Sequence, residues 1–114
     1  MPDCIFCQIA QGKSPAEIEY EDPEVIAFWD VNPKAPVHIL VIPKKHISET
    51  ISMTEKDAQI LGKMVLAGIK VAEKKNLKDT GFRMIINQGS HAGQIVDHLH
   101  LHVLGGKSLG KMAE

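Results

Sequence analysis

Apolar and polar positions along the chain follow two spacings, one typical of short strands and one typical of a long helix. Five strands are predicted, at residues 17–21, 24–30, 37–42, 82–87 and 96–104. From Thr54, a predicted N-cap, to about Asn76 the apolar residues recur at helical spacing. Residues 4–10 predict a second, short helix. The sequence therefore predicts an α+β fold, an antiparallel sheet of about five strands with one long and one short helix.

Length and composition narrow the class of protein. A chain of 114 residues suits one domain, expected to span residues 1–114. Apolar residues make up 44% of the chain, and the net charge of −1 gives no electrostatic reason to expect nucleic acid or a membrane as a partner. Apolar runs stay shorter than the roughly 18 residues of a membrane span, and the N-terminus has no signal-peptide pattern. We expect a soluble, cytoplasmic protein.

Three histidines occupy every second position near the C-terminus, at His98, His100 and His102, with aliphatic residues between them. In an extended strand this spacing places the imidazoles on one face, about 6.5–7 Å apart, and the aliphatic side chains on the other. The row has three interpretations, which are a purely structural origin, a metal site made by all three rings, and catalysis or anion binding. The regular alternation favours the last.

The two cysteines of the chain, Cys4 and Cys7, form a C-x-x-C pair. A reducing compartment argues against a structural disulfide, and the segment before Cys4 is too short for the strand of a thioredoxin-like motif. The pair is then half of a tetrahedral zinc site completed by two histidines, or simply two buried thiols on a short helix.

Two further segments suggest contacts with other molecules. In the loop of residues 87–94, Gly89 and Gly93 permit backbone geometries in which main-chain amides bind an anion such as phosphate, although an ordinary hairpin loop fits as well. The apolar stripe of the long helix is broad for a sheet of few strands, so a homodimer is expected. Gly68 in mid-helix predicts a close approach of the helix to its neighbour.

The run His98-Leu-His-Leu-His-Val103 matches the pattern His-φ-His-φ-His-φ-φ, in which φ is an apolar residue. The resemblance extends over most of the chain, through Cys4-Ile-Phe-Cys7, Ala27-Phe-Trp-Asp30, His38-Ile-Leu-Val-Ile-Pro-Lys-Lys-His46, Asn87-Gln-Gly89 and Gly93-Gln94. The sequence thus resembles the histidine triad (HIT) superfamily, and within it the Hint-like purine nucleoside phosphoramidases.

The resemblance implies a role for each matching residue. His100 corresponds to the nucleophile, which attacks the α-phosphorus while a backbone carbonyl holds its other ring nitrogen. His102 corresponds to a residue that contacts the phosphate or the leaving group, and His38 to a fourth active-site histidine. The implied nucleotide contacts are Asp30 on the ribose, Asn87, Gly93 and Gln94 on the phosphate side, and Phe6 and Ile9 as the apolar wall against the base.

Zinc-bearing relatives imply a ligand set as well. It consists of Cys4, Cys7, His46 and His98, a Cys₂His₂ combination suited to a closed structural zinc site. His91 in the glycine-containing loop is a competing ligand. The reaction scheme of the family requires no catalytic metal.

The expected activity is hydrolysis of the P–N bond of purine nucleoside 5′-phosphoramidates through a nucleotidyl-histidine, with AMP, GMP and their phosphoramidates as partners. Two alternatives are a dinucleoside polyphosphate hydrolase and a nucleotide-binding scaffold with little turnover. One position departs from the pattern, because Ile95 stands where many Hint-like sequences have Ser or Thr after Gly-Gln. The missing hydroxyl is expected to alter turnover or the preferred leaving group.

Overall fold

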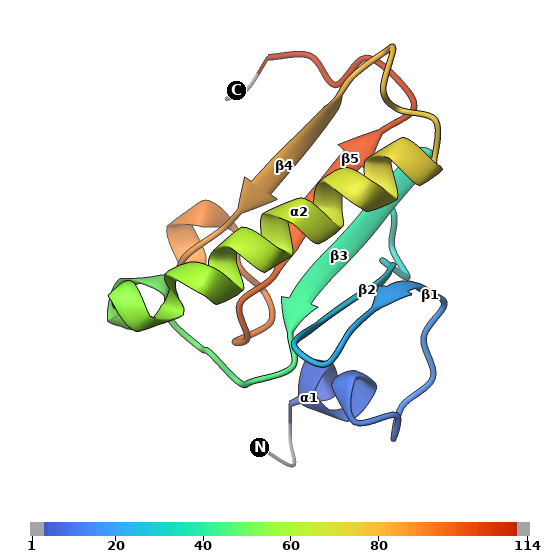
Figure 1. The fold of residues 1–114 in the computed structure, drawn as a ribbon. Coiled ribbons are helices and arrows are strands. Elements are labelled where there is room, and N and C mark those ends of the chain that lie inside the picture. Colours follow the sequence, from blue (N-terminus) through green and yellow to red (C-terminus); the bar gives the residue numbers. More distant parts are fainter. Residues whose placement is uncertain (1–3, 112–114) are drawn as a thin grey trace.

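A computed structural model describes residues 4–111 of the chain (Figure 1). Its strands are β1 (Ile18–Glu21), β2 (Val25–Trp29), β3 (Val37–Pro43), β4 (Phe82–Ile86) and β5 (Leu101–Gly105), and its α-helices are α1 (Ile5–Ala10) and α2 (Ala58–Lys74). Three short 3₁₀ helices occupy Thr50–Ser52, Glu55–Asp57 and Ser90–Ala92. The predicted α+β class, the five strands, and the long and short helices are confirmed. Among these residues no helix is long and apolar enough to cross a bilayer.

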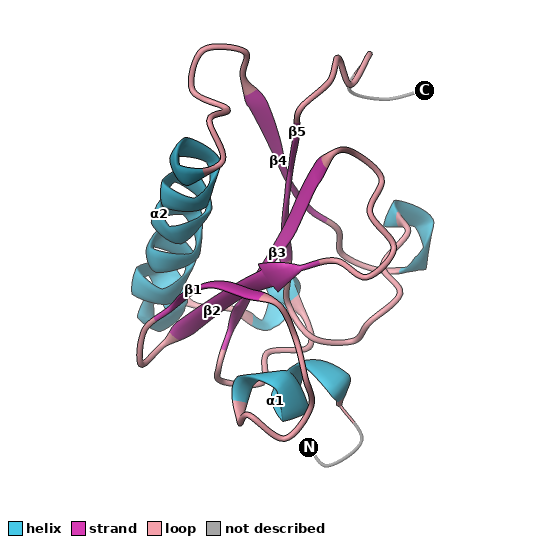
Figure 2. Cartoon of the chain, turned by 90° about the vertical axis from the view of Figure 1, so that its right-hand side faces the viewer, coloured by secondary structure: helices cyan, strands magenta, loops and turns pink. Residues whose placement is uncertain are grey.

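The five strands form one antiparallel sheet in the order β1-β2-β3-β5-β4. Helix α2 covers one face of this sheet, and α1 lies beyond the other (Figure 2). Both faces are therefore buried in the central strands. In β2, Val25 and Ala27 pack toward α2, whereas Ile26 and Phe28 pack with α1.

The start of α2 differs slightly from the prediction. Thr54 caps the 3₁₀ turn that precedes the helix, and its hydroxyl and the Asp57 carboxylate bond reciprocally to main-chain amides in a capping box. The regular α-helix begins at Ala58. The first predicted turn is thus helical but wound as 3₁₀, a common variation at helix ends.

The predicted strand 96–104 is wrong at its beginning, since β5 starts only at Leu101. The pairing of Val41 with Leu101, extended by two residues, would place Leu99 opposite Pro43. Proline has no amide hydrogen for the ladder. Instead, the Leu99 amide donates to the Ile47 carbonyl, so the chain leaves the sheet at this point.

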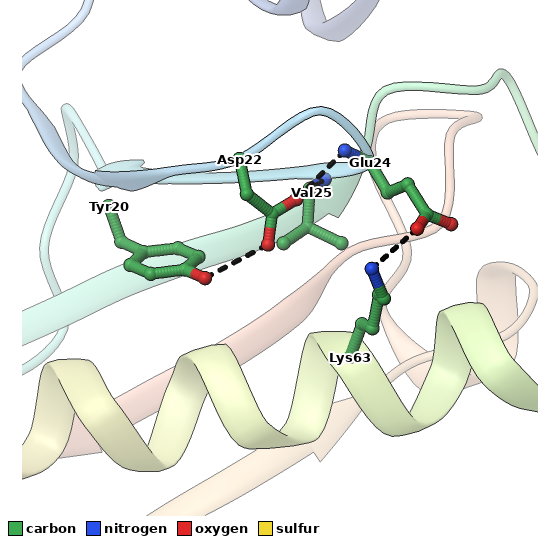
Figure 3. Close-up of polar contacts among 5 residues, drawn as sticks. All are labelled: Tyr20, Asp22, Glu24, Val25 and Lys63. Carbon is green, nitrogen blue, oxygen red and sulfur yellow. Dashed lines mark hydrogen bonds and ion pairs between the residues drawn. The ribbon is translucent and has the colours of Figure 1, made fainter.

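The β1–β2 hairpin is fixed to α2 by polar contacts (Figure 3). The Asp22 carboxylate accepts hydrogen bonds from the main-chain amides of Glu24 and Val25 and from the Tyr20 hydroxyl. Lys63 on α2 forms an ion pair with Glu24. The hairpin turn therefore has a defined conformation and is held over the helix.

Candidate active site and metal centre

Two of the predicted active-site histidines face each other across neighbouring strands. His102 on β5 lies opposite Leu40 on β3, two residues from His38 on the same face. Nε2 of His38 is 2.9 Å from Nδ1 of His102. Asp30, which follows β2, places Oδ2 3.4 Å from the same His38 nitrogen. The sheet thus brings together three of the predicted residues.

Hydrogen bonds define the tautomers of this pair. The Lys34 main-chain N–H donates to Nδ1 of His38 over 3.0 Å, so a neutral His38 carries its proton on Nε2. That N–H donates to Nδ1 of His102. The proton of His102 is consequently on Nε2. This ring offers an N–H donor to whatever binds beside it.

The same two rings stay uncharged at neutral pH. Burial, followed by the nearby His100 and His38, lowers the pKa of His102 to about 4, against a smaller opposite effect of Asp30. Burial also lowers the pKa of His38, although Asp30 favours its charged form. The hydrogen-bond direction from Lys34 to His102 is therefore the one present under physiological conditions.

His100 has the opposite tautomer. Its Nδ1 lies 2.7 Å from the main-chain carbonyl oxygen of His98, and a carbonyl only accepts, so Nδ1 carries the proton. In the neutral form of the ring, Nε2 is then the unprotonated nitrogen with an available lone pair. The His100 and His102 rings lie 4.9 Å apart. A nucleophilic nitrogen and an N–H donor thus sit on adjacent rings.

The residues predicted as a wall against the base lie on α1. Phe6 and Ile9 are both buried in the cluster between α1 and the sheet. The Phe6 ring meets the imidazoles edge-on, with ring centroids 5.2 Å from His100 and 5.8 Å from His98. Phe6 therefore packs against the histidine row itself.

The loop after β4 is closed by its own hydrogen bonds. The amides of Ala92, Gly93 and Gln94 donate to carbonyls at Gly89 and Ser90. These amides are therefore bonded within the loop, and the expected anion contact stays a prediction. The loop works as a preformed turn, in which Gly93 adopts the left-handed conformation at φ 87°.

The predicted phosphate-side residues flank this turn. Asn87 is half-buried directly after β4. The Gln94 side chain accepts from the Gly89 amide over 2.8 Å and donates to the Val96 carbonyl over 3.1 Å. One N–H of its amide group remains beyond the bond to Val96. The Gln94 side chain thus stabilises the conformation of the loop.

The predicted metal ligands converge from three separate segments. The donor atoms of Cys4, Cys7, His46 and His98 all lie within 4.8 Å of one another. Nδ1 of His98 is 3.2 Å from Cys4 Sγ and 3.6 Å from Cys7 Sγ, and Nδ1 of His46 is 3.2 Å from Cys7 Sγ. Tetrahedral zinc, with bonds of about 2.3 Å to sulfur and 2.0 Å to nitrogen, requires S···N separations of roughly 3.5 Å. His91 is exposed and lies outside this group.

The protonation states of the cysteine and histidine ligands also favour a bound cation between them. Nε2 of His98 is 2.9 Å from the Pro43 carbonyl oxygen and must donate to it, which leaves Nδ1 as a lone pair directed at the sulfurs. Burial is the main cause that raises the pKa of Cys7, so its thiol stays protonated unless a cation is present to stabilise the thiolate. The donor set therefore fits zinc.

Asp30, His38 and His102 also cluster closely enough to suggest a metal site. Their tautomers argue against one. Nδ1 of His38 already accepts the Lys34 N–H, so a metal on Nε2 would leave that ring without its proton. This trio is a hydrogen-bond chain, whereas the cysteine-containing group is suited to a metal.

Sequence reasoning missed three main-chain groups on which the site depends. They are the Lys34 amide, the Pro43 carbonyl and the His98 carbonyl. No residue type signals them, because every residue offers a carbonyl and nearly every one an amide. The general requirement for a backbone carbonyl behind the nucleophile was predicted, but its location came only with the fold.

Comparison with known proteins agrees with this geometry. A family model described as "Scavenger mRNA decapping enzyme C-term binding" matches residues 3–114. Protein HitA of Neisseria gonorrhoeae is 44% identical over 105 residues, which make up 92% of this chain and 97% of that protein. A HIT family hydrolase from Clostridium thermocellum superposes with a TM-score of 0.96 at 46% identity, over 100% of this chain and 99% of that one.

Two more distant structures carry informative descriptions. A Zn-bound histidine triad family protein from Mycobacterium smegmatis has a TM-score of 0.81 at 31% identity, over 98% of this chain and 81% of that one. A histidine triad nucleotide-binding protein from Candida albicans has a TM-score of 0.80 at 26% identity, over 98% and 87%. The antiparallel sheet with its imidazole row defines a histidine-triad domain. The chain belongs to the histidine triad (HIT) superfamily.

Proposed function

We propose that the protein is a nucleotide hydrolase of the Hint-like branch, which cleaves purine nucleoside 5′-phosphoramidates. The observation that carries this proposal is the tautomer of His100, whose Nδ1–H is held by the His98 carbonyl and whose Nε2 is free to attack. A neutral, oriented imidazole is the form that nucleophilic catalysis at phosphorus requires. The description of the Clostridium thermocellum relative as a hydrolase supports the same reading.

In the proposed reaction, Nε2 of His100 attacks the α-phosphorus and the P–N bond breaks. The departing nitrogen takes up a proton from water and leaves as an amine. The Nε2–H of His102 hydrogen bonds to a phosphoryl oxygen or to the leaving group and stabilises the charge that develops there. Water then hydrolyses the nucleotidyl-histidine, which releases the nucleoside monophosphate and restores the lone pair of His100.

The nucleotide contacts are proposed from the positions of the matching residues in the fold. The Asp30 carboxylate accepts the Asn32 amide over 2.8 Å and is oriented beside His38, so it is pre-set to accept ribose hydroxyls. Asn87, Gly93 and Gln94 are proposed for the phosphate side, and the α1 residues Phe6 and Ile9 for the base side. AMP, GMP and their phosphoramidates are the proposed ligands, in line with the nucleotide-binding relative from Candida albicans.

The test is turnover of a fluorogenic adenosine phosphoramidate by the wild type, His100→Ala and the exposed-loop control His91→Gln. We expect His100→Ala to lose activity by at least about a thousandfold, because it removes the attacking atom, and His91→Gln to retain it. Equal rates for wild type and His100→Ala would refute the proposed nucleophile. Faster turnover of diadenosine polyphosphates by the same preparation would favour a dinucleoside polyphosphate hydrolase. AMP binding without any turnover would favour a scaffold.

We also propose that Cys4, Cys7, His46 and His98 hold a structural zinc. The ligand spacing and the His98 tautomer support this, as does the Zn-bound relative from Mycobacterium smegmatis. When bound, zinc supplies a fixed tetrahedral link among three segments and leaves the proposed chemistry to the histidines. Reduced thiols of this kind are expected in the cytoplasm, which is the proposed location.

A homodimer is proposed from the surface around β4. This strand is at the edge of the sheet, and Ile86 at its end is exposed. Leu66 and Ile69 on α2 are exposed as well, at 60% and 42%. An unpaired strand edge beside apolar side chains is suited to pairing with a second copy of the chain.

A further inference from the structure

The connection between β4 and β5 is fastened at both ends to one short segment of the chain. Near its beginning, the side-chain oxygen of Gln88 accepts hydrogen bonds from the main-chain amide of Thr50 and, over 2.8 Å, from the Thr50 hydroxyl. Near its end, the Leu99 amide donates to the Ile47 carbonyl over 2.6 Å. Ile47 also packs against the core between α2 and the sheet. Residues 47–50, which follow β3, therefore anchor both ends of this connection (Figure 1).

A continuous line of contacts leads from Thr50 to Gln94. Gly89, the residue after Gln88, donates its amide to the Gln94 side chain over 2.8 Å and accepts the Gln94 amide over 3.1 Å. Gly89 has a positive φ of 85°. Since glycine can adopt many other conformations at little cost, this one has to be held by its neighbours. The placement of Gln94 thus depends on Gly89, which follows a side chain that Thr50 holds.

We propose that Thr50 is a positioning residue for the phosphate side of the site, through the two hydrogen bonds that it gives to Gln88. These bonds fix Gln88 and so limit the conformations open to Gly89 and the loop that follows. Without them the loop would have to become ordered when a phosphate binds, and this ordering would lower the affinity. The inference rests on the proposed function, which takes Gly93 and Gln94 as phosphate contacts.

A contribution to overall stability alone is the competing explanation. Thr50 is half-buried and Gln88 is exposed, and both lie outside the two buried core clusters. Loss of their hydrogen bonds should therefore leave the core intact. A purely structural role would lower the melting temperature and leave the loop amides and the nucleotide affinity unchanged. The two explanations differ in what happens to the loop while the protein stays folded.

The experiment uses variants that remove the hydrogen bonds from either side. Thr50→Ser keeps the hydroxyl, whereas Thr50→Val replaces it with a methyl group of nearly the same size. Gln88→Met keeps the length of the side chain and removes the oxygen that accepts both bonds. The double variant combines Thr50→Val with Gln88→Met. Ser52→Ala removes an exposed hydroxyl from the same 3₁₀ helix and is the control.

For each protein, hydrogen exchange is measured at the amides of residues 89–94, and the Kd for AMP is measured by titration calorimetry. We expect Thr50→Val to raise both the exchange rates and the Kd about threefold, and Gln88→Met, which removes two hydrogen bonds, about tenfold. In the double variant Thr50→Val should add nothing further, because the acceptor is already gone. Thr50→Ser and Ser52→Ala should behave like the wild type.

Turnover of the phosphoramidate gives a second measure. KM should rise together with the Kd for AMP, while kcat stays within about twofold of the wild-type value, because the substitutions leave His100 in place. A fall in kcat at unchanged KM would overturn the proposal, since the hydrogen bonds would then act on the chemical step.

Unchanged loop exchange in Thr50→Val and Gln88→Met would also overturn it, as would faster exchange with unchanged AMP affinity. Independent, additive effects in the double variant would show that the two residues do not act through their shared hydrogen bonds. Absence of AMP binding to the wild type would overturn the proposed function and this inference together. A wild type that binds AMP and turns over no phosphoramidate would refute the proposed hydrolysis alone, and the affinities would still decide the role of Thr50.

Discussion

Nε2 of His38 lies 2.9 Å from Nδ1 of His102, and the proton between them belongs to His38. This single contact links β3 to β5 and directs the N–H of His102 toward the proposed substrate. It also requires both rings to be neutral, because a proton on Nδ1 of His102 would face the donor of His38. The site is therefore sensitive to acid.

The first prediction concerns stability against pH. The pKa of His102 falls from an ordinary value of 6.5 to about 4 on folding. Its contribution to stability is complete above pH 6.5 and is lost as the pH falls toward 4, because the unfolded chain binds the proton first. The loss is on the order of 3 kcal/mol at most. Urea unfolding of wild type and His102→Asn at several pH values measures it.

In His102→Asn the slope of stability between pH 6.5 and 4 should be shallower than in the wild type. The burial-lowered pKa of His38 acts in the same direction and stays in both proteins, so the difference isolates His102. Identical slopes would show that His102 titrates normally in the folded protein.

The second prediction concerns zinc. The chain should bind one zinc ion, and Cys7→Ser or chelation should lower the melting temperature by on the order of 10 °C, since the metal ties α1, the segment after β3 and the segment before β5 together. Metal analysis and calorimetry measure both effects. Zinc uptake should release protons at neutral pH, because burial raises the pKa of Cys7. Cys7→Ser with full zinc content would contradict the ligand set.

The third prediction concerns Ile95, which is 93% exposed and follows Gln94 in the sequence. A threonine and a valine at this position have nearly the same shape and differ in the hydroxyl group. We expect Ile95→Thr to turn over phosphoramidate about two- to tenfold faster than Ile95→Val, the range of one neutral hydrogen bond. Both variants should unfold like the wild type. Equal kcat/KM values would show that a hydroxyl at position 95 does not reach the reacting group.

The fourth prediction concerns assembly. Light scattering should give the mass of a dimer for the wild type, and Ile86→Lys should shift it toward the monomer, because a charge at the edge of β4 opposes strand pairing. Ile51→Lys changes an equally apolar, exposed residue on the 3₁₀ helix Thr50–Ser52 and serves as the control. A dimer that tolerates Ile86→Lys would place the interface elsewhere on the surface. A monomeric wild type would contradict the proposed homodimer.

Much of the fold could be predicted from residue spacing, because it depends on local rules. Alternation in the row from His98 to Val103 correctly separated an imidazole face from an aliphatic face, and helical spacing located α2. The start of β5 could not be predicted in this way. It depends on Pro43, 58 residues before Leu101, which becomes its neighbour only when the sheet forms.

Some features of the candidate site could be predicted from the sequence, and others could not. The identity of the ligands and histidines followed from the resemblance, and the structure brings Cys4, Cys7, His46 and His98 together as expected. The tautomers did not follow, because they are set by main-chain groups such as the Lys34 amide. The internal hydrogen bonds of the loop did not follow either, because composition does not reveal that the Gly89 and Ser90 carbonyls accept from its amides.

The last prediction compares two glycines on the same helix. At Gly68 an added Cβ would meet Met84 Sδ and Val103 Cγ2 at 3.2 Å, whereas at Gly62 it would meet nothing within 4 Å. Alanine gains roughly 1 kcal/mol over glycine in a helix at either site. At position 62 we expect this gain in full. At position 68 the branched side chain of Val103 cannot move aside freely, so crowding of about 1–3 kcal/mol should outweigh the gain.

Urea unfolding of Gly62→Ala, Gly68→Ala and the wild type measures the two effects on one scale. We expect Gly62→Ala to be more stable than the wild type and Gly68→Ala to be less stable. If Gly68→Ala were as stabilising as Gly62→Ala, the contact between α2 and β5 would be loose. Position 68 would then not require a residue as small as glycine.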